Sequence, residues 1–191
     1  MRAFLIGLSA LAAAGNPANL AAQNADPSPA AVQPNNPQID FPAFVALAAD
    51  VQALRADRLL DLAAFRQMAD HPDILLLDAR SAEAFAQGHM DGAVNLPLPD
   101  FTAQSLAATI GPNTGRTILI YCNNNFVNDV APVMRKAVAL ALNIQTMINL
   151  HGYGYPNVFE LGEAVDLADP ILRWMPAIPS AERTQARGAQ P

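Results

Sequence analysis

The stretch LLLDARSAEAFAQGHMDGAVNLPL, residues 75–98, decides the fold. It begins in a continuous apolar run over residues 74–77, which is strand-length and apolar on both faces. Such a run is typical of a strand in the middle of a parallel sheet. The pattern then predicts a short helix over residues 81–87, capped by Ser81. A short strand is expected over residues 94–96, after a glycine-rich reversal of the chain.

The rest of the folded region repeats this alternation of helices with buried strands. A second strongly apolar strand is expected over residues 117–121 (TILIY), and a further one over residues 158–161 (VFEL). Helices are expected over residues 41–56, 62–69 and 101–110, the second of them capped by Asp61. Helices alternating with buried strands predict an α/β fold with a parallel sheet.

The region between Cys122 and Tyr155 has two interpretations. In one, a helix runs over residues 127–142. In the other, an irregular excursion precedes a helix that Asn143 caps. We favour the helix capped by Asn143 and leave the earlier stretch open.

The N-terminus has the pattern of a secretory signal. A positive start, Met1-Arg2, precedes an apolar run over residues 3–14 and then small residues. The run is too short to span a membrane, and the alternative is a buried N-terminal helix. We predict a signal peptide over residues 1–25 and a periplasmic or secreted protein with no membrane anchor after cleavage.

Proline-rich and polar segments flank the expected domain. Residues 26–40 are rich in Pro, Ala, Asn and Gln, which predicts a flexible linker. Residues 176–191 are expected to be a disordered tail for the same reason. A single domain over residues 41–175 remains.

Composition excludes several classes of function. The net charge is −6 without any basic run, which argues against nucleic acid as a partner. Three scattered histidines and one cysteine cannot form a zinc cluster or an internal disulfide. We therefore expect no metal and no cofactor.

The one cysteine, Cys122, ends the apolar strand TILIY and so should lie at the carboxyl edge of the sheet, where open α/β sheets build their sites. Asn123, Asn124 and Asn125 follow it. Asparagine tolerates left-handed backbone angles, so the loop can turn backbone N–H groups inward around an anion. A surface loop with a half-buried, inert cysteine is the alternative.

Three segments resemble the rhodanese-like domain family. The first is residues 75–98, where a strand ending in Asp-x-Arg precedes a helix and Gly-His-x-x-Gly-Ala-x-Asn-x-Pro. This chain has Asp78, Arg80, Glu83, Phe85, Gly88, His89, Gly92, Ala93, Asn95 and Pro97 in those places. The segments ILIYC, residues 118–122, and GYPNVFEL, residues 154–161, resemble the nucleophile strand and the last strand of the family.

The resemblance implies a five-stranded parallel sheet flanked by helices, with Cys122 as the catalytic nucleophile. The loop that would bind substrate is Asn123, Asn124, Asn125, Phe126 and Val127. Asp78 and Arg80 are expected to have a structural role, as a buried or half-buried ion pair or through bonds to backbone. His89 is expected to be a turn residue whose hydrogen bonds are made within the turn. Active members of the family usually have a glycine and often a basic residue in this loop, and here both are missing.

The resemblance implies a single-domain sulfurtransferase that works through a Cys122 persulfide. Its partners would be a small sulfur-containing anion and a thiol acceptor. The alternative is a non-catalytic binding or thiol-redox module in the periplasm. A phosphatase is excluded because the position six after Cys122 is Asn128, not the arginine that clamps a phosphoryl group.

Two properties of the loop are predicted. The pKa of Cys122 should be depressed by converging N–H groups. One asparagine should hold a left-handed backbone angle, and another should offer its amide to substrate.

Overall fold

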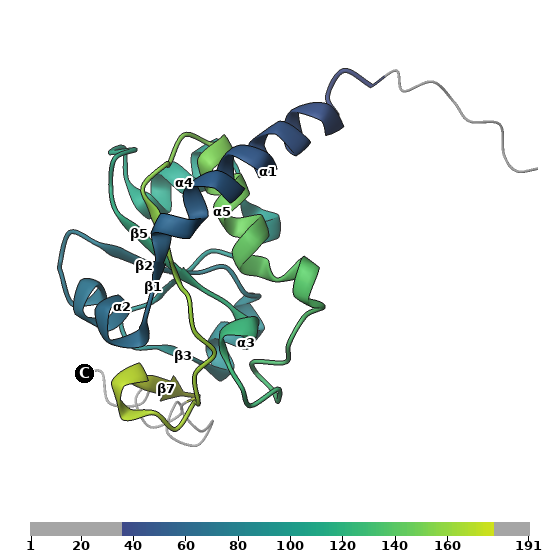
Figure 1. Cartoon of the computed structure of the whole chain (residues 1–191). Coiled ribbons are helices and arrows are strands. Elements are labelled where there is room, and N and C mark those ends of the chain that lie inside the picture. Colours follow the sequence, from purple (N-terminus) through teal and green to yellow (C-terminus); the bar gives the residue numbers. More distant parts are fainter. Residues whose placement is uncertain (1–35, 178–191) are drawn as a thin grey trace, which may run out of the picture. The chain divides into compact units, whose positions relative to one another are not determined.

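The computed structural model describes residues 36–177 (Figure 1). The predicted signal peptide over residues 1–25 lies outside the described residues, as do most of the predicted linker and of the predicted tail. Asp40, assigned to the linker, caps the first helix through its side chain, 2.9 Å from the Ala43 N–H.

The centre of the domain is a five-stranded parallel sheet in the order β1-β6-β5-β2-β4. Its strands are β1 (Leu59–Leu60), β2 (Leu75–Asp78), β4 (Val94–Asn95), β5 (Ile118–Tyr121) and β6 (Val158–Leu161). The predicted parallel α/β sheet is confirmed. Because β5 is the middle strand, the residue that follows it lies at the centre of the sheet's carboxyl edge.

Helices cover both faces of this sheet (Figure 1). They are α1 (Phe41–Arg55), α2 (Leu62–Ala69), α3 (Ala82–Gln87), α4 (Ala103–Ile110) and α5 (Leu142–Gly152). Alternate residues of β5 enter different apolar clusters: Ile118 and Ile120 pack with α1, α4 and α5, whereas Leu119 and Tyr121 pack with α2. This two-sided burial is the reason why the central strands are apolar at every position.

The local signals for two helices are confirmed. Asp61 caps α2 by accepting the Ala64 N–H at 2.7 Å. Ser81 caps α3 by accepting the Ala84 N–H at 3.2 Å.

The sequence did not predict a small antiparallel sheet, β3 (Gly88–Met90) with β7 (Trp174–Pro176). Gly88 makes this pairing possible, because a Cβ there would lie 2.7 Å from the Trp174 indole nitrogen. The predicted start of the disordered tail at residue 176 is wrong, because Pro176 is paired with Gly88 and Ala177 donates to the Gln87 carbonyl at 2.9 Å.

The stretch before α5, which the sequence left open, is an irregular excursion. Between Phe126 and α5 the only regular element is a short 3-10 turn, Val138–Leu140. The helix begins at Leu142 with Ala141 at its N-cap, so Asn143 is not the cap but a buried residue of the first turn. Its side chain points into the domain instead of back to its own helix.

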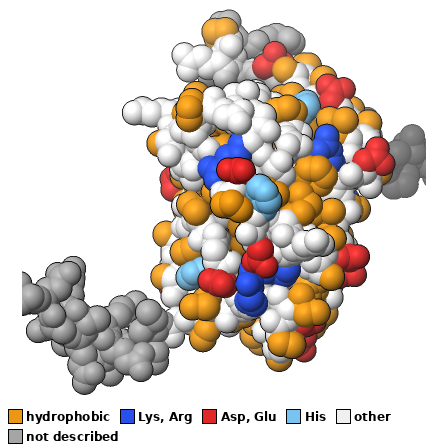
Figure 2. Space-filling view, turned by 90° about the vertical axis from the view of Figure 1, so that its left-hand side faces the viewer, with side chains coloured by type: hydrophobic (Ala, Val, Ile, Leu, Met, Phe, Trp, Pro, Cys, Tyr) orange, Lys and Arg blue, Asp and Glu red, His pale blue; other side chains and the backbone are white. Residues whose placement is uncertain are grey.

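No helix of the described part of the chain is long and apolar enough to cross a membrane. On the face drawn in Figure 2, acidic and basic side chains are interspersed among apolar ones, without an extended patch of either sign.

Candidate active site at Cys122

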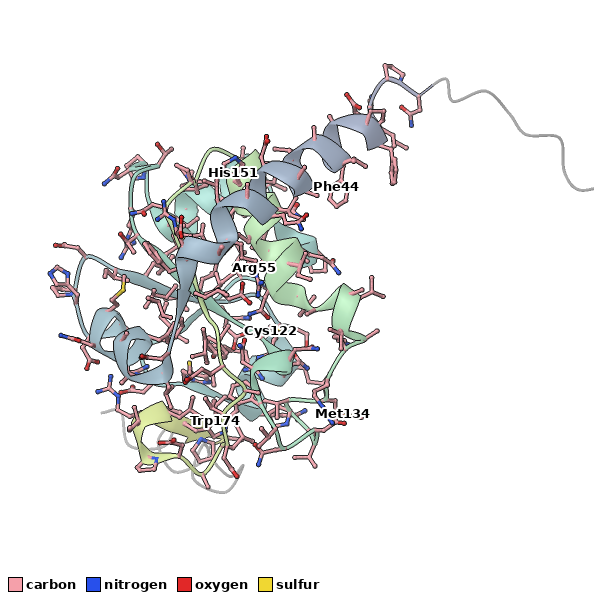
Figure 3. All side chains as sticks on the ribbon, in the orientation of Figure 1. Phe44, Arg55, Cys122, Met134, His151 and Trp174 are labelled. Carbon is pink, nitrogen blue, oxygen red and sulfur yellow. The ribbon has the colours of Figure 1, made fainter. Side chains whose placement is uncertain are left out.

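Cys122 directly follows β5 and lies inside the domain (Figure 3). Only 1% of the residue is exposed to solvent. It begins a short 3-10 turn, Asn123–Asn125, which turns the chain away from the sheet edge. The predicted position at the carboxyl edge is therefore confirmed, but the sulfur is covered.

Polar groups from two segments meet at the sulfur. The Cys122 thiol donates a hydrogen bond to the side-chain carbonyl of Asn143, and the Asn124 N–H points to Sγ at 3.4 Å. The backbone N–H groups of Leu142 and Asn143 lower the pKa of the thiol. These last donors belong to the N-terminus of α5, where unpaired N–H groups favour negative charge.

Burial nevertheless raises the pKa of the Cys122 thiol. The three backbone N–H groups lower it, and the charge of Glu160 raises it further. Desolvation is the largest of these effects, because a thiolate in a dry site loses its hydration. The prediction of a depressed pKa is wrong for this conformation.

The Asn125 side chain joins three segments of the domain. Its Oδ1 accepts from the Cys122 N–H and from the Asn143 side-chain amide, both at 2.9 Å. Its Nδ2 donates to the carbonyls of Leu161 at 2.6 Å and Glu163 at 3.1 Å. All the hydrogen-bonding capacity of this side chain serves to position the loop, α5 and the end of β6.

Asn123 and Asn124 bind the segment that precedes α5. The Asn123 amide donates to the Met134 carbonyl at 2.6 Å. Asn124 makes a reciprocal pair with the Lys136 backbone, donating at 2.9 Å and accepting at 3.0 Å. Both side chains recognise backbone, as in a β-ladder, and so hold the excursion against the cysteine loop.

The predicted left-handed asparagine is wrong. Among the described non-glycine residues, positive φ occurs at Asp129 and Arg173 only. The 3-10 turn after Cys122 curls the loop with ordinary right-handed angles, so no glycine substitute is needed there.

The last two loop residues predicted to bind substrate point elsewhere. Phe126 is fully buried in the α2-side cluster, edge-on to the rings of Tyr121 and Trp174. Val127 is 52% exposed, and its N–H donates to the Val165 carbonyl at 3.0 Å. Neither side chain contributes a polar group at the sulfur.

Asp78 and Arg80 form the predicted buried ion pair. The guanidinium approaches the carboxylate at 2.6 Å through Nη2 and at 3.0 Å through Nε. Tyr121 donates its hydroxyl to the same carboxylate at 2.6 Å. Arg80 also donates to the Gly88 carbonyl at 2.7 Å, which fixes the start of β3.

The His89 ring has a hydrogen-bond partner and a stacking partner within its turn, as expected. Its Nδ1 lies 2.8 Å from the Phe85 carbonyl, and its ring stacks on the Phe85 ring at 3.8 Å.

A groove of about 440 Å³ lies beside the loop, lined in part by Asn124, Arg135, Asn143, Arg55, Glu160 and Glu163. Glu160, a buried carboxylate on β6, is paired with Arg55 of α1 at 2.7 and 2.8 Å. Asn143, Glu160 and Arg55 were not predicted as neighbours of the site. The one available signal was Glu160 itself, a charged residue inside the apolar strand VFEL.

The family model described as rhodanese-like domain matches residues 61–163, and the chain belongs to that family. No curated protein matches the chain. Within the described residues, no group of three or more His, Cys, Asp or Glu side chains could hold a metal ion.

Several solved structures are similar to this chain. The Alr3790 protein from Anabaena sp. is 18% identical, with 67% of this chain and 90% of that chain covered and a TM-score of 0.46. The single-domain sulfurtransferase RDL2 from Saccharomyces cerevisiae is 13% identical, with 56% and 85% covered and a TM-score of 0.39. The polysulfide-sulfur transferase homodimer from Wolinella succinogenes is 18% identical, with 63% and 79% covered and a TM-score of 0.38.

Proposed function

We propose that the protein is a sulfurtransferase in which Cys122 carries the transferred sulfur as a persulfide. The observation that carries this proposal is the set of backbone N–H groups at Cys122: that of Asn124, which lies 3.4 Å from Sγ, and those of Leu142 and Asn143 in the first turn of α5, which lower the pKa of the thiol. Fixed N–H donors stabilise a thiolate or persulfide anion without a charged side chain. They take the place of the basic residue that this loop lacks.

The reaction has two steps. The Cys122 thiol first loses its proton to solvent, and the thiolate attacks the outer sulfur of an anion such as thiosulfate. The new S–S bond forms as the donor's S–S bond breaks, and sulfite leaves with the electron pair. A thiolate acceptor then attacks the outer sulfur of the persulfide, takes it as its own persulfide, and releases the Cys122 thiolate.

A second candidate is a binding module that does not turn over. The near-complete burial of Cys122 and its raised pKa favour this function, because the thiolate is the nucleophile and it is scarce in a dry site. Such a module would bind an anion or peptide at the groove and keep its thiol unused.

Intact-mass spectrometry after incubation with thiosulfate separates the two candidates. The sulfurtransferase gains one sulfur atom, and a thiol acceptor then removes it. The Cys122→Ser variant gains none. If the parent protein stays at its original mass over a range of thiosulfate concentrations and pH, the sulfurtransferase is excluded and the binding module remains.

A further inference from the structure

Two hollows flank the cysteine loop, and one stretch of chain separates them. The groove of about 440 Å³ is on one side. On the other side lies a cavity of about 330 Å³, which reaches the end of β2 at Ala79 and Arg80. Cys122 lines neither of them, although its neighbours in the sequence line both.

Adjacent residues are divided between the hollows. Asn124, Arg135 and Asn143 line the groove, whereas Asn123, Lys136 and Leu142 line the cavity. In each of these three pairs of sequence neighbours, one residue lines the groove and the other lines the cavity. The chain at these pairs therefore forms a partition between the two hollows. The sulfur bonds to the Asn143 side chain and to the Asn124 N–H, and both of these residues line the groove.

The outer part of the partition is residues 134–140, which we call the strap. All seven are exposed, with Met134 at 60%, Val138 at 85% and Leu140 at 61%. Buried residues bound the strap at both ends, Val133 at 0% and Ala141 at 9% exposure. The strap has no apolar anchor of its own between those two points.

Hydrogen bonds from the cysteine loop hold the strap in place. Asn123 donates to the Met134 carbonyl, and Asn124 makes its reciprocal pair with Lys136. The remaining side-chain bonds are to exposed or surface groups: Asp129 with the N–H and guanidinium of Arg135, and Gln145 with the Leu140 carbonyl. A segment held by few bonds at the surface opens at a low free-energy cost.

We infer that the strap is a cover over Cys122, latched by Asn123 and Asn124, and that its release joins the two hollows into one site with the sulfur at its floor. Val133 and Ala141 are the fixed ends about which it moves. Release hydrates the sulfur and removes the main cause of its raised pKa, while the donors from α5 and Asn124 remain. The two asparagines are thus positioning residues that act through the strap.

The rate of Cys122 alkylation by iodoacetamide at fixed pH tests the latch directly. Each neutral hydrogen bond that is lost should shift the opening equilibrium by about fivefold. Asn123→Ala should therefore react about fivefold faster than the parent, and Asn124→Ala up to about thirtyfold faster. Asn149→Ala is the matched control, because its amide bonds to a backbone carbonyl at 2.8 Å in α5 and does not touch the strap.

Hydrogen exchange distinguishes release of the strap from general unfolding. In Asn124→Ala, the Lys136 amide should exchange faster, while the amides of Leu119 and Ile120 in β5 keep the parent's protection. Latch variants that react at the parent's rate would overturn the inference. Faster reaction together with lost protection in β5 would overturn it as well, because the asparagines would then support the whole domain. This readout does not depend on sulfur transfer, so it stays separate from the proposed function.

Discussion

Asn143 accepts a hydrogen bond from the thiol of Cys122, which lies 21 residues earlier in the chain. The contact exists because the first turn of α5 is packed against the end of β5. It places one side-chain carbonyl at the sulfur, and two backbone N–H groups of the same turn lower the pKa of the thiol. The carbonyl stabilises the protonated thiol, whereas the N–H groups stabilise the thiolate, so the site can hold either form.

Replacement of Asn143 by Asp should raise the pKa of Cys122 further, because a second negative charge would contact the sulfur. We expect alkylation at pH 8 to slow by about tenfold or more. The measurement is the rate of iodoacetamide reaction against pH. Asn149→Asp adds the same charge to the same helix and should leave the profile unchanged. If the midpoint of the pH profile of alkylation is unchanged in Asn143→Asp, the side chains of Cys122 and residue 143 are not in contact.

The raised pKa of Cys122 predicts a pH-dependent stability. A thiol with a higher pKa in the folded state binds its proton more tightly there than in the unfolded chain. The stabilisation that the protonated thiol gives the folded state is complete below the pKa of the unfolded chain, about 8.5. It is lost as the pH rises towards the higher pKa of the folded state. Urea denaturation should show the parent losing stability above about pH 8.5 relative to Cys122→Ser. Parallel curves for the two proteins would contradict this prediction.

Arg80 should be essential to the fold. In Arg80→Met the buried carboxylate of Asp78 keeps Tyr121 but loses its counter-charge, and the Gly88 carbonyl loses a donor. Removal of one partner of a buried ion pair costs about 3–5 kcal/mol. Denaturant unfolding measures this loss. Arg135→Met breaks an exposed Arg–Asp pair, with Asp129, and should show no comparable effect. Similar losses of unfolding free energy in both variants would contradict the prediction that burial makes the Asp78–Arg80 pair the more important one.

Glu160→Gln should lower the pKa of Cys122, since the carboxylate charge raises it. The pKa shift should be opposite in sign to that of Asn143→Asp, since a negative charge is removed and not added. It should also be smaller, because Glu160 makes no hydrogen bond to the sulfur. Its pH profile of alkylation should move to lower pH. Glu83→Gln removes a charge from exposed α3 and serves as the control. A profile that moves upward would mean that the Arg55 pair, not the charge, governs the sulfur.

Local signals in the sequence were sufficient for most of the fold. The caps Asp61 and Ser81 define helix starts through side-chain bonds to residues only three positions away. The apolar run of β5 implies burial on both faces whatever its neighbours are. The pair β3–β7 was missed because each strand is short and its partner is distant in the sequence.

The sequence by itself determined the family, the parallel sheet and the place of Cys122 at its carboxyl edge, because hydrophobic period, caps and turns act over a few residues. Only the tertiary structure decided the state of that cysteine. Its burial, its bond to Asn143 and the charge of Glu160 depend on segments brought together from 20 to 40 positions away along the chain. Asn123, Asn124 and Asn125 show the same difference between sequence and tertiary structure. Their residue type suggested a left-handed turn angle and contacts with substrate. In the structure, their side-chain amides donate to backbone carbonyls of the strap and of β6. Desolvation and long-range hydrogen bonds have no local pattern, so they appear only when the chain is folded.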